Sequence, residues 1–166
     1  VYSDIFFAAF KLPNLFRRVF GEGAFTQSFL PNFIHSRRKG MFALITFLIF
    51  AFFILILSMF VMCFSGFFTK LLAYGFDEAT INLAKPIVAI NFWYLELVFI
   101  VTFLSSLLQY KNCFWVNAYN TALLNLSMIA ALFLAHDKDS MQVAYLLSYG
   151  VICGGIAQIL LHFYPL

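Results

Sequence analysis

Ser3–Pro31, SDIFFAAFKLPNLFRRVFGEGAFTQSFLP, decides how this chain is interpreted, because it is long enough to cross a bilayer and yet carries charged residues. At about 1.5 Å per residue, a helix over this stretch would be roughly 42 Å long, against about 30 Å for the hydrocarbon core of a membrane. Lys11, Arg17, Arg18 and Glu22 would lie in its middle portion, where each charge costs roughly 2.5–3.5 kcal/mol. We therefore expect these charges to be kept from lipid, against neighbouring helices or in a water-filled cavity.

The composition is that of an integral membrane protein. Of the 166 residues, 64% are hydrophobic and 10% are charged, whereas soluble domains have about 45–50% apolar and about 25% charged residues. No basic face with interleaved aromatics lies outside the apolar runs, so we expect no nucleic-acid partner. The three cysteines are far apart and lack the spacing of a metal site. We expect no metal and no cofactor, and the absence of a recognisable catalytic triad or carboxylate pair argues against an enzyme.

The apolar runs predict an all-α, polytopic membrane helix bundle with five transmembrane spans. The expected spans cover residues 3–31, 41–68, 86–110, 114–135 and 141–164. The connection between the second and third spans, residues 69–85, is expected to be exposed to water. The chain begins with Val1 and ends directly behind an apolar run, so we expect it to be an internal part of a longer membrane protein.

The loop charges predict the orientation of the bundle. Arg37, Arg38 and Lys39 in the first loop and Lys111 in the third have no acid beside them, whereas the other two loops carry three lysines and four acids. Because loops rich in lysine and arginine stay on the cytoplasmic side, we expect the first loop to be cytoplasmic.

The charges of the opening stretch share one side of the predicted helix. At about 100° per residue, a sector roughly 80° wide holds Asp4, Lys11, Asn14, Arg18 and Glu22. Arg17 flanks this sector, and Pro13 is expected to kink the helix. The three cations outnumber the two acids, and guanidinium suits bidentate contact with phosphate. The residues thus predict a transporter with a cavity for an anionic, phosphate-bearing substrate.

A purely structural alternative remains for the same residues. Arg18 could pair with Glu22 one turn away, and Lys11 could extend to the interface, which would make the helix a polar seam in a bundle. The protein would then be a membrane scaffold or a non-transporting subunit.

Two further polar residues are secondary candidates. Glu96 stands alone in an apolar span, where it is either a proton or cation site or a structural acid. Asn125 shares the next span with Asn117 and Asn120, where hydrogen bonding between helices is the expected role. His162, near the end of the last span, is expected to lie at the membrane interface.

The opening stretch resembles the second transmembrane segment of the MurJ/MviN family, the bacterial lipid II flippases. The likeness rests on Asp4, the run AFKLPN at 9–14, the pair Arg17-Arg18 and the run EGAF at 22–25. Residues 75–77 resemble the family's loop after its third segment, Leu124–Ile129 its fifth segment, and Gly154-Gly155 with Gln158 its sixth. The resemblance covers the whole chain.

The resemblance implies a fold and a function. The fold would be that of the multidrug/oligosaccharidyl-lipid/polysaccharide exporter superfamily, in which two six-helix lobes surround a cavity, and this chain would supply segments two to six of the first lobe. The activity would be the flipping of lipid II, an undecaprenyl-diphosphate-linked disaccharide-pentapeptide, across the bacterial inner membrane for peptidoglycan synthesis. The positions that match cavity residues of the family are Asp4, Arg17, Arg18 and Glu22. The implied partners are lipid II, membrane lipids and the rest of the same chain, and an exporter of another polyprenyl-linked glycan is the alternative.

Overall fold

The computed structural model describes residues 2–21, 23–72, 74–75 and 77–165, and every regular element in these ranges is a helix. The helices are α1 (Tyr2–Gly21), α2 (Ala24–His35), α3 (Lys39–Cys63), α4 (Ser65–Leu72), α5 (Glu78–Tyr110), α6 (Trp115–Leu134) and α7 (Ser140–Phe163). Within the described residues, four of them, α3, α5, α6 and α7, are long and apolar enough to cross a membrane. The all-α class and the membrane character predicted from the composition are confirmed.

The opening stretch forms two helices instead of the single helix expected over 3–31. α1 ends at Gly21 and α2 begins at Ala24, with Gly23 between them at φ 99°. That left-handed backbone conformation cannot continue a right-handed helix, and glycine adopts it without the steric cost that a Cβ would bring. Pro13 lies inside α1, which continues past it. The break at Gly23 is thus the feature that separates the two halves of the stretch.

The elements between residues 41 and 86 also differ from the expected ones. The apolar run 41–68 is divided at Phe64 into α3 and α4. α5 begins at Glu78, so residues 78–85 are helical and Pro86 lies inside the helix instead of in its first turn. Glu78 in the first turn suits the positive N-terminal end of a helix, which explains why the helix starts before the proline. α6 and α7, by contrast, lie within one residue at each end of the ranges expected for the last two spans.

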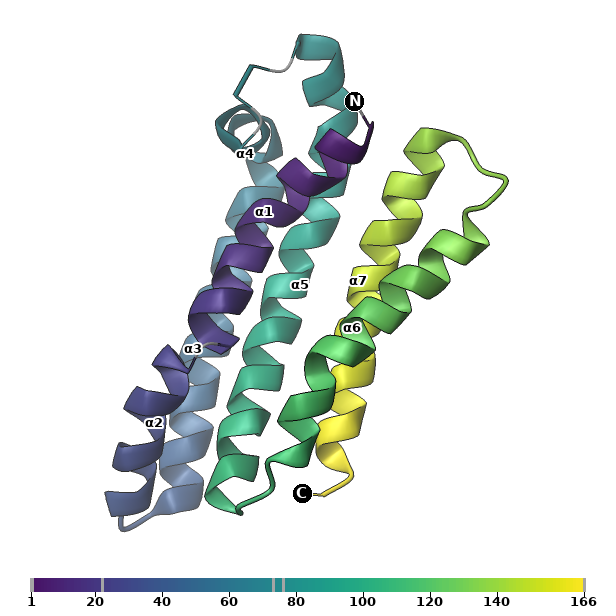
Figure 1. Cartoon of the computed structure of the whole chain (residues 1–166). Coiled ribbons are helices and arrows are strands. Elements are labelled where there is room, and N and C mark those ends of the chain that lie inside the picture. Colours follow the sequence, from purple (N-terminus) through teal and green to yellow (C-terminus); the bar gives the residue numbers. More distant parts are fainter. Residues whose placement is uncertain (1, 22, 73, 76, 166) are drawn as a thin grey trace.

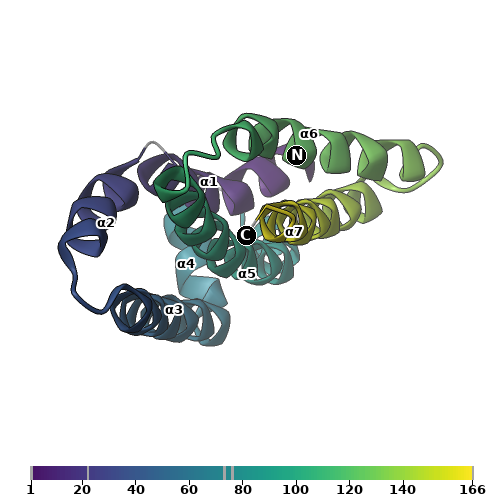
Figure 2. The ribbon, with the colours of Figure 1, turned by 90° about the horizontal axis from the view of Figure 1, so that it is seen from below.

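The long helix α5 is the centre of the bundle. It packs against α1, α2, α3, α4 and α7, and Figures 1 and 2 show it surrounded by these helices. Phenylalanine rings fill the contact with α2 and α3. The ring centroids of Phe29 and Phe47 lie 5.3 and 5.1 Å from that of Phe103, and Phe25 lies 5.6 Å from Phe99. Such offset and edge contacts between aromatic rings fix α2 and α3 on one side of α5.

α6 is held mainly by α7, and the contact depends on glycine. α7 runs without a break through Gly150 and Gly154, and both lie against α6. A Cβ at Gly150 would meet the Cβ of Ala131 at 2.8 Å and the carbonyl oxygen of Ser127 at 3.2 Å. The Ser127 hydroxyl donates a hydrogen bond of 2.8 Å to the Gly150 carbonyl. Small residues thus allow the backbones of the two helices to approach closely, as is common in membrane proteins.

The loops divide between two ends of the bundle. Figure 1 places the α2–α3 loop, the α5–α6 loop and the C-terminus at one end, and the N-terminus and the α6–α7 loop at the other. Arg37, Arg38 and Lys39 belong to the first end, and so does Lys111. We call this the basic end of the bundle.

Candidate functional site

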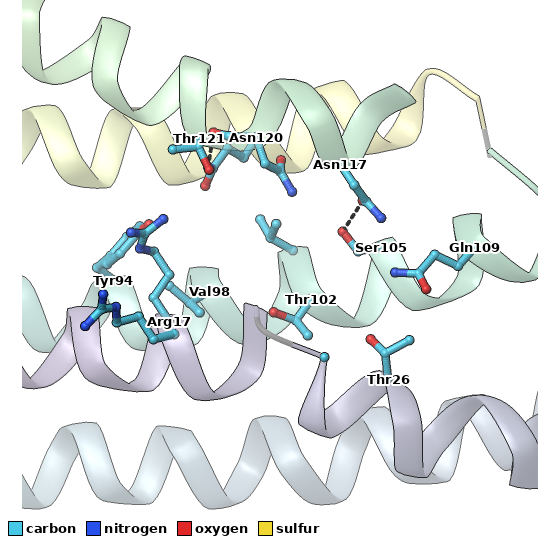
Figure 3. Close-up of a pocket in the computed structure, with 14 residues that line it drawn as sticks. Arg17, Thr26, Tyr94, Val98, Thr102, Ser105, Gln109, Asn117, Asn120 and Thr121 are labelled. Carbon is cyan, nitrogen blue, oxygen red and sulfur yellow. Dashed lines mark hydrogen bonds between the residues drawn. The ribbon is translucent and has the colours of Figure 1, made fainter. Parts of the chain in front are cut away.

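A cavity of about 360 Å³ lies between α1 and α2 on one side and α6 and α7 on the other, with α5 beside it. Figure 3 shows Arg17 and Tyr94 at one end of this cavity and Thr26 and Gln109 at the other. The residues that line it are Arg17, Arg18, Gly23, Thr26, Tyr94, Val98, Val101, Thr102, Ser105, Gln109, Asn117, Asn120, Thr121 and Gln158.

Two arginines from the last turns of α1 give the cavity its charge. The Nε group of Arg17 donates a hydrogen bond of 3.1 Å to Oδ1 of Asn14, one turn earlier in the same helix. Within the described residues, no carboxylate is within ion-pair distance of Arg17 or Arg18, and no acid is among the residues that line the cavity. The described lining is therefore positively charged at the end where these side chains lie.

The opposite part of the cavity is polar and uncharged, and helical spacing explains why. On α5, residues at three- and four-residue intervals share one side of a helix, and the polar residues Thr102, Ser105 and Gln109 follow this spacing. α6 contributes Asn117, Asn120 and Thr121, which share one side in the same way. Hydroxyl and amide groups of this kind both donate and accept hydrogen bonds.

Hydrogen bonds between helices hold the uncharged wall in place. The Ser105 hydroxyl lies 2.6 Å from Oδ1 of Asn117 on α6 and 2.8 Å from Nε2 of His162 on α7. The side chain of Gln158 donates a bond of 2.6 Å to the backbone carbonyl of Asn120. Asn117 therefore has the interhelical role that its sequence position predicts. The expectation for His162 was wrong, because its side chain is fully buried between helices and hydrogen-bonded instead of lying at an interface.

Only some of the residues that the opening stretch predicts for the site lie together at the cavity. Arg17 and Arg18 line the cavity. Asp4 and Lys11 are exposed on earlier turns of α1 and are not among the lining residues. Glu22 lies outside the described residues.

The two secondary candidates lie outside the lining as well. Helical spacing puts Glu96 on the side of α5 that carries Phe99 and Phe103 toward α3, roughly opposite the cavity. Its Oε2 atom is buried and has no hydrogen-bond partner among the described residues. Asn125 is exposed on α6. In the part of the chain that the structure describes, no group of three histidine, cysteine or acidic side chains could hold a metal ion.

Sequence reasoning did not single out Thr26, Tyr94, Ser105, Gln109 or Gln158 as site residues. Two of them, Ser105 and Gln109, could have been found from the recurrence of polar groups every three or four residues in the second half of α5. Tyr94 carries no such signal, because an aromatic residue in an apolar span is indistinguishable from a core residue until the helices are placed.

Comparisons with known proteins agree on one family. The family profile described as "Lipid II flippase MurJ" matches residues 1–166. Proteins named "Probable lipid II flippase MurJ" from two strains of Helicobacter pylori are 61% and 60% identical over 166 residues, which is 100% of this chain and 36% of each relative. A "Lipid II flippase MurJ" from Burkholderia cenocepacia is 31% identical, over 96% of this chain and 32% of the relative.

A solved structure agrees in fold. The structure described as "Lipid II flippase MurJ, inward closed conformation" matches with a TM-score of 0.82 and 25% identity. The match covers 96% of this chain and 35% of the solved chain. The chain thus spans about a third of the length of the proteins that it matches.

Proposed function

Because this chain belongs to the MurJ family of lipid II flippases, we propose that it is part of a protein that moves lipid II across the bacterial cytoplasmic membrane. Lipid II is an undecaprenyl-diphosphate-linked disaccharide-pentapeptide, and its transfer from the inner to the outer leaflet supplies peptidoglycan synthesis. The chain contributes helices of the first lobe, and the rest of the cavity comes from the remainder of a longer chain. No covalent chemistry is involved.

The observation that carries the proposal is the pair of arginines in a cavity whose described lining contains no acid. A diphosphate bears several anionic oxygens, and guanidinium groups bind such oxygens through paired N–H donors. A cavity for a cationic drug would instead need acidic groups. The charge of the lining therefore favours an anionic lipid over a cation as the substrate.

The uncharged part of the lining suits the rest of the head group. Sugar hydroxyls and peptide amides need donors and acceptors without net charge, which the side chains of Thr102, Gln109, Asn120 and Thr121 provide. The cavity extends from Arg17 toward the basic end of the bundle, which the positive-inside rule assigns to the cytoplasm. We propose that the head group enters from this side and that the cavity then opens to the other side by alternating access.

The roles of the individual charges follow from this mechanism. Arg17 and Arg18 attract the diphosphate. Asp4 and Glu22 gate the cycle through ion pairs with basic side chains, and these pairs rearrange between states, as matched positions of the family suggest. The prenyl chain stays in lipid beside the lobe. An exporter of another polyprenyl-linked glycan would use the same arginines, and the uncharged lining is where its head-group specificity would differ.

The experiment replaces Arg17 in the full-length protein that carries this segment. In a bacterial strain depleted of its own lipid II flippase, we expect the unaltered protein to restore growth and Arg17→Ala to fail while still reaching the membrane at normal levels. Arg37→Ala is the matched control, because this arginine is exposed in the loop at the basic end, and it should restore growth. Normal growth with Arg17→Ala at ordinary expression would remove the arginine from the mechanism.

A further inference from the structure

Tyr94 is a buried residue whose hydroxyl group has no partner in the described part of the chain. Its side chain is 1% exposed, and its Oη atom is buried without a hydrogen bond to any described residue. The same side chain lines the cavity beside Arg17, as Figure 3 shows. A buried hydroxyl that forms no hydrogen bond is destabilising, since it has lost its bonds to water.

Packing explains the ring of Tyr94 but not its hydroxyl. The ring centroid lies 5.9 Å from that of Phe10 on α1. On the α7 side, a Cβ at Gly155 would come within 3.2 Å of Cε2 of Tyr94, so the ring lies close to the backbone of that helix. Phenylalanine would fill this space equally well without the uncompensated hydroxyl. The oxygen therefore indicates a bond to something that enters the cavity.

The neighbouring groups define the chemistry of that ligand. Arg17 and Arg18 present N–H donors to the cavity and cannot accept hydrogen bonds. The Tyr94 hydroxyl can donate its proton to the same kind of acceptor. Donors on α1 and α5 that converge on one end of a cavity suit a group with several acceptor oxygens and negative charge, which describes a phosphate.

We infer that Tyr94 is a further substrate-binding residue, whose hydroxyl donates a hydrogen bond to an oxygen of the diphosphate bound by Arg17 and Arg18. The inference rests on the proposed function, which supplies the diphosphate. It adds to the arginines a neutral, rigid donor on α5, the central helix of the bundle. The packed ring fixes the position of the hydroxyl, so that one phosphate oxygen is held at a set place between α1 and α5.

The test measures binding of two short probes to the purified full-length protein in detergent. Farnesyl diphosphate carries the acceptor oxygens, whereas farnesol has the same chain without them. We expect Tyr94→Phe to weaken the binding of farnesyl diphosphate about tenfold or more, as the loss of a hydrogen bond to a charged acceptor implies. Farnesol binding should be unchanged, and the melting temperature of the ligand-free protein should be at least as high as that of the unaltered protein, because the uncompensated hydroxyl is removed. Tyr149→Phe, at an exposed position on α7, is the matched control and should bind both probes normally.

The outcomes separate this inference from the proposed function. If Arg17→Ala loses affinity for farnesyl diphosphate and Tyr94→Phe does not, the inference is wrong and the proposed function stands. An equal loss of both probes by Tyr94→Phe would mean that the hydroxyl has a structural role and would also overturn the inference. If neither variant changes the binding of farnesyl diphosphate, both proposals fail.

Discussion

Arg17 and Arg18 line the cavity, and the proposed function depends on their placement more than on that of any other residue. A guanidinium within the apolar thickness of a membrane is stable only beside water, hydrogen-bonding groups or an anion. Arg17 has one such contact in Asn14, through Nε, and the terminal amino groups of its guanidinium are the ones suited to a bidentate anion contact. In the proposed function, the bond from Nε to Asn14 orients the arginine before the substrate arrives, which lowers the entropy cost of binding.

Glu96 provides a test of which charges take part in transport. Helical spacing puts it on the side of α5 that faces α3, and it does not line the cavity. We therefore expect Glu96→Gln to retain lipid II transport within about twofold. A proton site would instead lose transport, because glutamine keeps the size of the side chain and removes its ability to ionise. Transport rates of the two proteins in vesicles, compared at several pH values, distinguish the structural acid from the proton site.

Sequence alone could identify the arginines but not the full set of cavity residues. The sequence prediction grouped Asp4 and Lys11 with Arg18 because the three residues lie at similar angles around the helix axis. It did not take into account how far apart they are along that axis. Asp4 is about 20 Å from Arg17 along α1 at 1.5 Å per residue, and the cavity begins near Arg17. Tyr94 and Ser105 became visible only when the fold placed α5 beside α1 and α6.

At the scale of the element, the helices were predictable and the breaks between them were not. Hydropathy located the apolar runs, because each helix in a membrane needs about 20 apolar residues. Gly23 at φ 99° divides the opening stretch, yet the sequence EGA reads equally well as the middle of a helix, since glycine is common in membrane helices. Pro86 was assigned to a helix start, although a helix in a bundle tolerates proline inside it when its neighbours support it.

The α6–α7 contact gives a prediction at this scale. Gly150→Ala should destabilise the full-length protein, because its Cβ would meet Ala131 and the backbone oxygen of Ser127, neither of which can move away easily. Overpacking of this kind costs about 1–3 kcal/mol, and we expect a melting temperature lower by a few degrees in detergent.

Gly40→Ala is the matched control for the same substitution. Gly40 lies in α3, and a Cβ there would meet nothing within 4 Å. Alanine favours a helix over glycine by up to about 1 kcal/mol, so this variant should be at least as stable as the unaltered protein. Equal melting temperatures for the two variants would contradict the close α6–α7 packing.

At the scale of the whole molecule, the proposed function makes the chain one wall of a larger transport cavity. α5 supports the wall, α1 and α2 bring the arginines and Thr26, and α6 and α7 bring the uncharged amides. The chain spans about a third of its relatives' length, and a cavity of about 360 Å³ is small for a disaccharide-pentapeptide. Under the proposed function, the rest of the full-length protein supplies the remaining volume and the second half of the alternating-access cycle.

Transfer of lipid II by the full-length protein in reconstituted vesicles tests the central claim most directly. Fluorescent lipid II is placed in both leaflets, and its movement to the outer leaflet is followed with a reagent that cannot cross the membrane. We predict transfer well above that of protein-free vesicles, and a loss of at least tenfold when Arg17 and Arg18 are both replaced by alanine. Transfer at the protein-free rate by the unaltered protein, or equal transfer by the double variant, would contradict the account.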